Sequence, residues 1–241
     1  MELARDGPGL LYRDILKGEA ADVDTVAAVI AHVAPDVLVL TAFDYDHGGA
    51  ADAVGYGEFR GQGGMAVLSR WPVDTDAVQD LSGIIWSDLP GAIPPPGPYA
   101  DLPLSTTAHW DVPVTTPAHG VLRVLAFYAS PPVFDGPEDR NGRRNHDETA
   151  LWRAWLDGVL PGDPPERGFV IAGDANLDVA DGDGRPGALN GLLADPRLQD
   201  PMPASRGGVA AAAQGGANDA HRGAPALDTA DWRDAGPNDP G

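Results

Sequence analysis

The stretch Phe-Val-Ile-Ala-Gly-Asp-Ala-Asn, residues 169–176, combines an apolar run with the strongest candidate site in the sequence. Its first four residues are a continuous apolar run, which is typical of a strand buried on both faces. Asp174 and Asn176 follow two residues apart and are expected to face the cleft beyond the strand's end. A carboxylate there can accept a proton from water, and a carboxamide can donate to a phosphoryl oxygen. The residues fit equally well an Asx-type turn that closes the strand.

Further short apolar runs lie to the N-terminal side of this stretch. They are typical of buried strands, and two of them are arranged as a hairpin around the turn at 118–120. Short strands joined by long loops, with few helices, predict an α+β (α/β) fold of packed sheets flanked by helices. The predicted strands are 37–40, 65–68, 112–114 and 121–128.

Two longer helices are predicted from amphipathic spacing. The first covers 23–33, with Asp22 as its N-cap. The second follows the polar block 135–148, with Asn145 as its N-cap and Glu148 in the capping-box position. A short third helix is predicted at 188–193. The buried stripe of the second helix comprises Leu151, Trp152, Trp155, Leu156 and Val159.

Composition excludes several classes of protein. No apolar run approaches the roughly 18 to 20 residues of a membrane span, and no signal peptide is visible, which leaves a cytoplasmic or a mature exported form open. The chain has no cysteine, so thiolate chemistry and disulfides are excluded. Its net charge of -20 disfavours non-specific duplex DNA as a partner, because DNA affinity comes mainly from Lys and Arg contacts with phosphate. The oligomeric state is not fixed by the sequence.

One basic cluster stands out in this acidic chain. It lies where a helix N-terminus is predicted, and backbone N–H groups at such a terminus favour anions. The cluster is therefore a candidate phosphate clamp. The alternative is a set of salt bridges to the neighbouring acids. Its members are Arg140, Arg143, Arg144, Asn145 and His146.

Four segments, in this order, resemble the endonuclease/exonuclease/phosphatase superfamily: 23–43, 64–70, 122–130 and 173–176. The block 131–148 resembles a bacterial branch of that superfamily. The resemblance implies a DNase I-like four-layer sandwich of two mixed sheets flanked by helices, formed by 1–241 as a single domain. It also implies metal-dependent hydrolysis of a phosphoester by water, in which Asp174 activates the nucleophile and Asn176 contacts the phosphate. Beyond about residue 204 the chain is rich in Ala, Gly, Asp and Pro, and we expect 204–241 to be flexible.

The sequence departs from the family pattern at several positions. The family's metal-binding Glu falls at Ala42, and its mid-chain His falls near Tyr128, which becomes a candidate substrate contact. The first-strand Asn would precede Met1 and the closing Asp-His pair would follow Gly241. We therefore expect an incomplete copy of the family pattern, with catalysis either rebuilt or lost. A non-catalytic relic that binds an anionic or phosphorylated ligand is the alternative function.

Rebuilding would require new metal ligands. Asp44 and Asp46 lie two and four residues beyond the empty Glu position, and together with Asp174 they could offer hard oxygen ligands to Mg²⁺, or to Mn²⁺ or Ca²⁺. Solvated loop acids are the simpler interpretation of the first two. His146 is counted with Asp174 and Asn176 among the catalytic candidates. Asp178, Asp181 and Asp183 lack the distal Glu of a calcium loop and indicate a polar turn.

Overall fold

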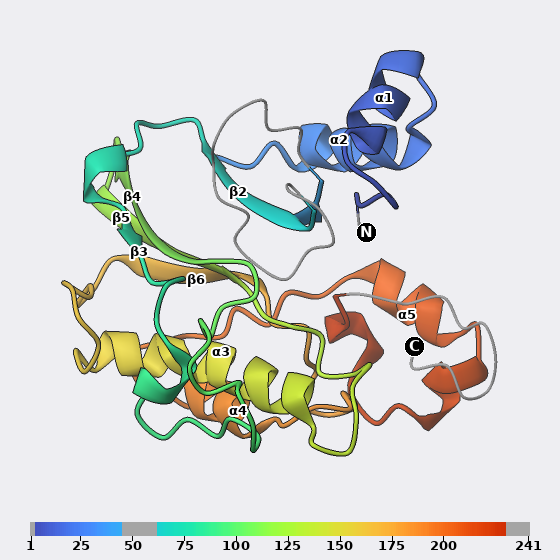
Figure 1. The fold of residues 1–241 in the computed structure, drawn as a ribbon. Coiled ribbons are helices and arrows are strands. Elements are labelled where there is room, and N and C mark those ends of the chain that lie inside the picture. Colours follow the sequence, from blue (N-terminus) through green and yellow to red (C-terminus); the bar gives the residue numbers. More distant parts are fainter. Residues whose placement is uncertain (1–2, 45–61, 230–241) are drawn as a thin grey trace.

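A computed structural model describes residues 3–44 and 62–229 of the protein. Two β-sheets and five α-helices form an α+β fold (Figure 1). The smaller sheet pairs β1 (Val37–Phe43) with β2 (Gly64–Ser69) in antiparallel fashion. The larger sheet has the order β3-β4-β5-β6, and its strands are β3 (Gln79–Asp80), β4 (His109–Thr116), β5 (Gly120–Tyr128) and β6 (Phe169–Asp174).

The predicted strands all occur. β4 and β5 form the expected antiparallel hairpin, and β6 then adds to β5 in parallel. The register pairs Phe127 with Gly173 and Tyr128 with Asp174, so the carboxyl ends of β5 and β6 meet at one edge of the sheet. The residues that follow both strands are thereby brought together.

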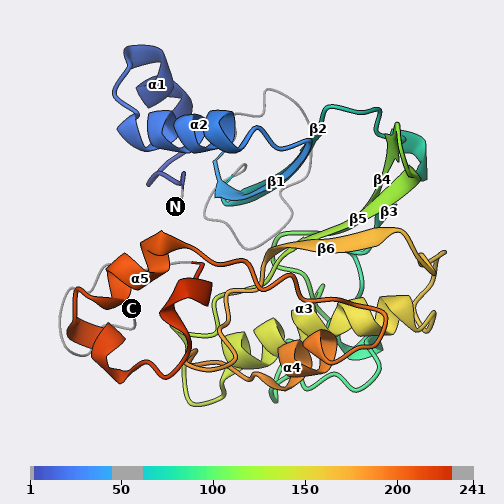
Figure 2. The same cartoon turned by 180° about the vertical axis from the view of Figure 1, so that it is seen from behind.

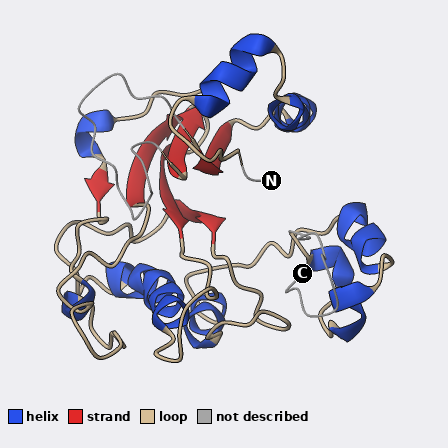
Figure 3. Ribbon diagram, turned by 45° about the vertical axis from the view of Figure 1, so that its right-hand side comes forward, coloured by secondary structure: helices blue, strands red, loops and turns tan. Residues whose placement is uncertain are grey.

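Helices flank the sheets. Figures 1 and 2 show the strands between α1 (Leu10–Lys17) and α2 (Ala21–Val33) on one side and α3 (Arg140–Leu156) and α4 (Gly187–Leu193) on the other. The last described α-helix is α5 (Arg206–Ala212). Figure 3 shows the strands between the groups of helices. Within the described residues no helix is long and apolar enough to cross a membrane.

Side chains of β5 alternate between two cores. Leu125 and Phe127 face a cluster formed with Trp152 and Trp155 of α3. Val124 and Ala126 face a second cluster that includes Met65 of β2 and, from β1, Val37 and Val39. The larger sheet is therefore covered by α3 on one face and by the smaller sheet on the other, as the strand pattern predicted.

The predicted helix starts were wrong. Asp22 lies in the first turn of α2, whose N-cap residue is Ala20. The helix α3 begins at Arg140, so Asn145 lies inside it and does not cap it. The carboxylate of Asp135 accepts the N–H of Asn141 from outside the helix and satisfies a donor of the first turn, which permits this earlier start.

The C-terminal part contains more structure than its Ala- and Gly-rich composition suggested. Besides α5 it forms 3₁₀ turns at Gly216–Ala220 and Pro225–Leu227. The expected flexibility of 204–241 stays a prediction, and residues 230–241 lie outside the described part of the chain.

Candidate active site

The candidate site begins at the end of β6. Gly173 has a φ of 153°, and a Cβ atom there would lie 1.9 Å from the carbonyl oxygen of Phe127, so only glycine fits beside β5. The next residue, Asp174, accepts the N–H of Asn176 on Oδ1 at 2.8 Å. The Asx-type turn is therefore present. Both side chains remain half-buried at the sheet edge, so the turn does not remove them from a site.

The exit of β5 lies against this turn. The main chain of Ala129 donates its N–H to the carbonyl of Asp174 at 2.8 Å, and its own carbonyl accepts Nδ2 of Asn176 at 2.8 Å. Asn176 has a φ of 46°, a left-handed conformation that Asn tolerates better than most residues. One Nδ2 hydrogen of Asn176 remains for another acceptor.

The basic cluster does not form a single clamp. Arg144 is buried, its Nη1 donates to the carbonyls of Pro103 and Leu104 at 3.0 and 2.9 Å, and its guanidinium stacks on Trp86. This placement disagrees with the expected phosphate contact. The sequence did not predict this placement, because nothing near Arg144 shows that its long cationic side chain will bond carbonyl groups inside the protein.

Arg140 and Arg143 are only partly buried. Arg143 donates to the carbonyls of Glu138 and Ile93 at 3.1 and 3.2 Å. The guanidinium of Arg140 lies 5.7 Å from the Tyr99 ring centre. Arg140 also donates from Nε to Oδ1 of Asn141 at 3.2 Å. Of the cluster, His146 bonds a neighbouring acid, Asp147, as the salt-bridge alternative expected.

Asn145 is fully buried and turns toward the strand ends. Its Nδ2 donates to the carbonyls of Ser130 and Ala175 at 2.8 and 2.7 Å. It therefore contacts main chain at the exits of both β5 and β6, instead of facing solvent as a substrate ligand would.

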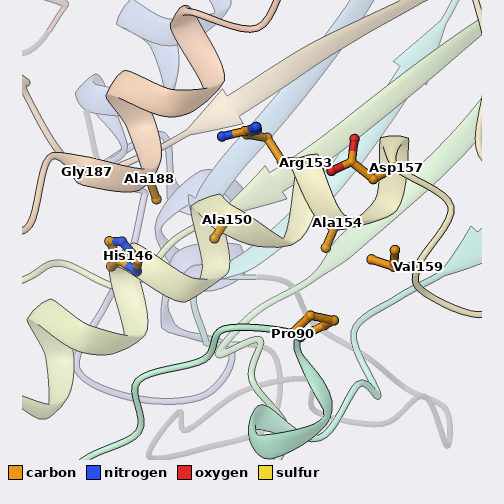
Figure 4. Close-up of a pocket in the computed structure, with 9 residues that line it drawn as sticks. All are labelled: Pro90, His146, Ala150, Arg153, Ala154, Asp157, Val159, Gly187 and Ala188. Carbon is orange, nitrogen blue, oxygen red and sulfur yellow. The ribbon is translucent and has the colours of Figure 1, made fainter.

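His146 is partly buried and bonds its neighbour in α3. Its Nδ1 bonds Oδ1 of the buried Asp147 at 2.8 Å, and the other carboxylate oxygen accepts N–H groups from Trp86 and Ile93. His146 lines a pocket of about 430 Å³ to which both α3 and α4 contribute residues (Figure 4). Asp174 and Asn176 are not among the residues that line this pocket. The other lining residues are Pro90, Ala150, Arg153, Ala154, Asp157, Val159, Gly187 and Ala188.

The metal candidates do not form a cluster in the described residues. Asp44 is buried and accepts the N–H groups of Arg5 and Gly63, on Oδ2 at 2.6 Å and on Oδ1 at 3.2 Å. Asp46 lies outside the described residues. Across 3–44 and 62–229, no three His, Asp or Glu side chains are grouped so that they could hold an ion. These residues alone do not fit a complete metal site.

Tyr128 is the last residue of β5 and is half-buried, packed against the core shared by the two sheets. It is paired in register with Asp174, so a place near the site follows from the strand pairing.

A buried polar network behind the strand ends escaped sequence reasoning. Glu148 accepts the N–H of Ser130 at 2.6 Å and both the N–H and the hydroxyl of Thr106, at 2.8 and 3.0 Å. Burial raises the pKa of Glu148 to about 7. The sequence does contain a clue to the burial of Glu148. It lies three residues before Leu151 and four before Trp152, which places it on the same, buried face of the helix.

His109 belongs to the same network. It is fully buried, with Nδ1 2.6 Å from the hydroxyl of Ser105 and Nε2 2.9 Å from the carbonyl of Glu148. Burial lowers the pKa of His109 to about 4, so the ring is neutral at pH 7. One partner, Ser105, lies four residues before His109, whereas the carbonyl of Glu148 comes from a segment 39 residues away.

Comparison with known proteins identifies the family of the chain. Neither a curated protein nor a solved structure matches the chain. The Endonuclease/Exonuclease/phosphatase family matches residues 15–239, which include every helix and strand from β1 to α5. The chain therefore belongs to the endonuclease/exonuclease/phosphatase family.

Proposed function

We propose that the protein hydrolyses a phosphoester with water at the carboxyl ends of β5 and β6. The family consists in general of metal-dependent phosphoester hydrolases. The observation that carries the proposal is the turn at Asp174 and Asn176, which holds a carboxylate and a carboxamide half-buried at one sheet edge. The same proposal includes the four-layer DNase I-like sandwich and a single domain over 1–241.

Each side chain has one role in the proposed reaction. Oδ2 of Asp174, the oxygen that the Asx-type turn leaves over, accepts a proton from the attacking water. The second Nδ2 hydrogen of Asn176 donates to a phosphoryl oxygen as charge develops there. The water oxygen bonds to phosphorus, the ester P–O bond breaks, and the leaving oxygen takes a proton from solvent.

The proposed site also binds a divalent cation, to which we assign no step of the reaction. Family members in general use divalent metals, and Mg²⁺, Mn²⁺ or Ca²⁺ would neutralise phosphoryl charge when bound. Asp174, Asp44 and Asp46 are the proposed ligands. Because the described residues contain no group of three ligands, no step is assigned to the ion.

The charge of the chain points to a small substrate. A net charge of -20 repels a polyanion, which favours a small phosphoester or a phospholipid headgroup over non-specific duplex DNA. Arg140, Arg143 and Tyr128 are the proposed substrate contacts, since each is half-buried and lies on or after β5 or at the start of α3.

A second function is binding of a phosphorylated or anionic ligand without hydrolysis. The observation that favours it is the lack of a three-ligand group within the described residues. Ala42 and Tyr128, at the positions of the family's Glu and His, point the same way. We therefore expect slow turnover at most.

The test is hydrolysis of bis-p-nitrophenyl phosphate with Mg²⁺, Mn²⁺ or Ca²⁺ by wild type, Asp174→Asn and Asn176→Ala. The matched control is Asp183→Asn, which alters an exposed carboxylate on the following loop. Turnover lost in the two site variants and kept in the control supports hydrolysis. The second function is supported if wild type shows no turnover but binds inorganic phosphate, and Asn176→Ala does not bind it. Turnover unaffected by Asp174→Asn contradicts the proposed site.

A further inference from the structure

One buried amide joins the two strand exits. Nδ2 of Asn145 lies 2.8 Å from the carbonyl oxygen of Ser130, two residues after β5, and 2.7 Å from that of Ala175, one residue after β6. Ala175 stands between the two proposed site residues. Asn145 is fully buried and lies in the second turn of α3, so its helix fixes it from behind the sheet edge.

The chemistry of the bridge requires an amide. Both carbonyl oxygens are acceptors, and the two hydrogens of one NH₂ group can serve both at once. A carboxylate in the same place would bring a negative oxygen toward two carbonyl oxygens. The other amide atom, Oδ1, is buried and has no hydrogen-bond partner within the described residues. The side chain is therefore held by its donors alone.

Glu148, one helical turn later, contacts the same segment. Its carboxylate accepts the N–H of Ser130 at 2.6 Å, so α3 holds the main chain of Ser130 at both its N–H and its carbonyl group. The adjacent Ala129 bonds the carbonyl of Asp174 and the side chain of Asn176. Hydrogen bonds, together with the peptide bond between Ala129 and Ser130, thus connect Asn145 to both proposed site residues.

We infer that Asn145 is a positioning residue, which sets Asp174 and Asn176 for the phosphoester by holding the exits of β5 and β6 together. The inference rests on the proposed function. Asn145 itself does not touch substrate, because its donors are used inside the protein. Displacement of reacting groups by about 1 Å can cost roughly 100-fold in rate, so loss of this bridge is expected to act on kcat.

The kinetic experiment compares wild type, Asn145→Ala, Asn176→Ala and the double variant, with bis-p-nitrophenyl phosphate as substrate. The control is Asn190→Ala, at an exposed asparagine of α4. We expect Asn145→Ala to lower kcat about 10- to 100-fold with little change in KM. We expect the double variant to lose little beyond Asn176→Ala, because residues that act as a unit are non-additive. Multiplied losses would overturn the inference and show a purely structural role.

A second readout does not depend on turnover. In protein labelled with ¹⁵N-asparagine, the side-chain NH₂ signals of Asn176 should shift in Asn145→Ala and stay in place in Asn190→Ala. If Asn145→Ala does not fold, Asn145→Ser replaces it, since the hydroxyl is too short to serve both carbonyl groups. Unmoved Asn176 signals would overturn the inference. Lack of turnover in wild type together with shifted signals would defeat the proposed hydrolysis and leave the positioning role intact.

Discussion

The guanidinium of Arg144 lies 4.3 Å from the centre of the Trp86 ring, within the protein interior. The indole N–H of Trp86 donates in turn to Asp147 at 2.6 Å. Two residues of α3 therefore hold Trp86, Arg144 over the face of its ring and Asp147 at the indole N–H. This arrangement gives the arginine a structural role that a phosphate-binding side chain would not have.

Arg144→Lys is expected to lower the free energy of unfolding by about 2 kcal/mol. Lysine keeps the charge but loses the planar stacking on Trp86 and the geometry that reaches two carbonyl oxygens. Urea unfolding measures the change, with Arg206→Lys, at an exposed position of α5, as the control. Equal stability of the two variants would contradict the structural role of Arg144.

Glu148→Gln is expected to change how stability depends on pH. Burial raises the pKa of Glu148 from 4.5 to about 7. Between these pH values the folded state keeps a proton that the unfolded state has released. The contribution of Glu148 to the free energy of unfolding is therefore full below pH 4.5 and is lost as pH rises through 7, by about 3 kcal/mol.

Glutamine does not titrate, so the stability of wild type relative to Glu148→Gln should fall between pH 4.5 and pH 8. Urea unfolding at pH 4.5, 6 and 8 measures the difference. Glu166→Gln, at an exposed glutamate, should show no such trend. A difference that stays constant, or that rises with pH, would contradict the prediction.

Asp181→Ala is expected to expose the peptide bond after Arg222 to trypsin. The carboxylate of Asp181 accepts the N–H groups of Arg222 and Gly223 at 2.8 and 2.6 Å, and these hydrogen bonds lower its pKa. Removing the acceptor allows this segment to open, so trypsin should cleave it several-fold faster. Mass spectrometry of the digest measures the rate of this cleavage. Asp183→Ala is the control. Equal cleavage in both variants would contradict the proposal that Asp181 holds the main chain of Arg222 and Gly223 in place.

Local sequence pattern predicted the strands because each of them contains a short apolar run. The runs at 37–40, 65–68 and 169–172 are continuous and apolar, and the structure places each in a strand. The turn at Asp174 and Asn176 was also visible, since Asx-type turns depend on residues two apart. These features are local, so neighbouring residues were enough to find them.

The rest depends on contacts between distant segments. The interior side of α3 carries Asn145, Glu148 and Arg144, whose partners are main-chain groups of loops 15 to 42 residues away. A polar residue on an otherwise apolar stripe does not reveal which carbonyl or N–H group it will meet. The helix start was misplaced for the same reason, because buried polar residues resembled capping residues.

The two hydrogen bonds of Asp44 bear on how this protein could be engineered. One carboxylate holds the backbone of Arg5 and that of Gly63, and Phe43 pairs with Gly64, so the described residues on either side of the segment 45–61 lie close together. The entropy of closing a loop grows only slowly with its length. Segments of other lengths, including a reporter peptide or a small folded insert, should be accepted between these anchors while the sheets keep their register.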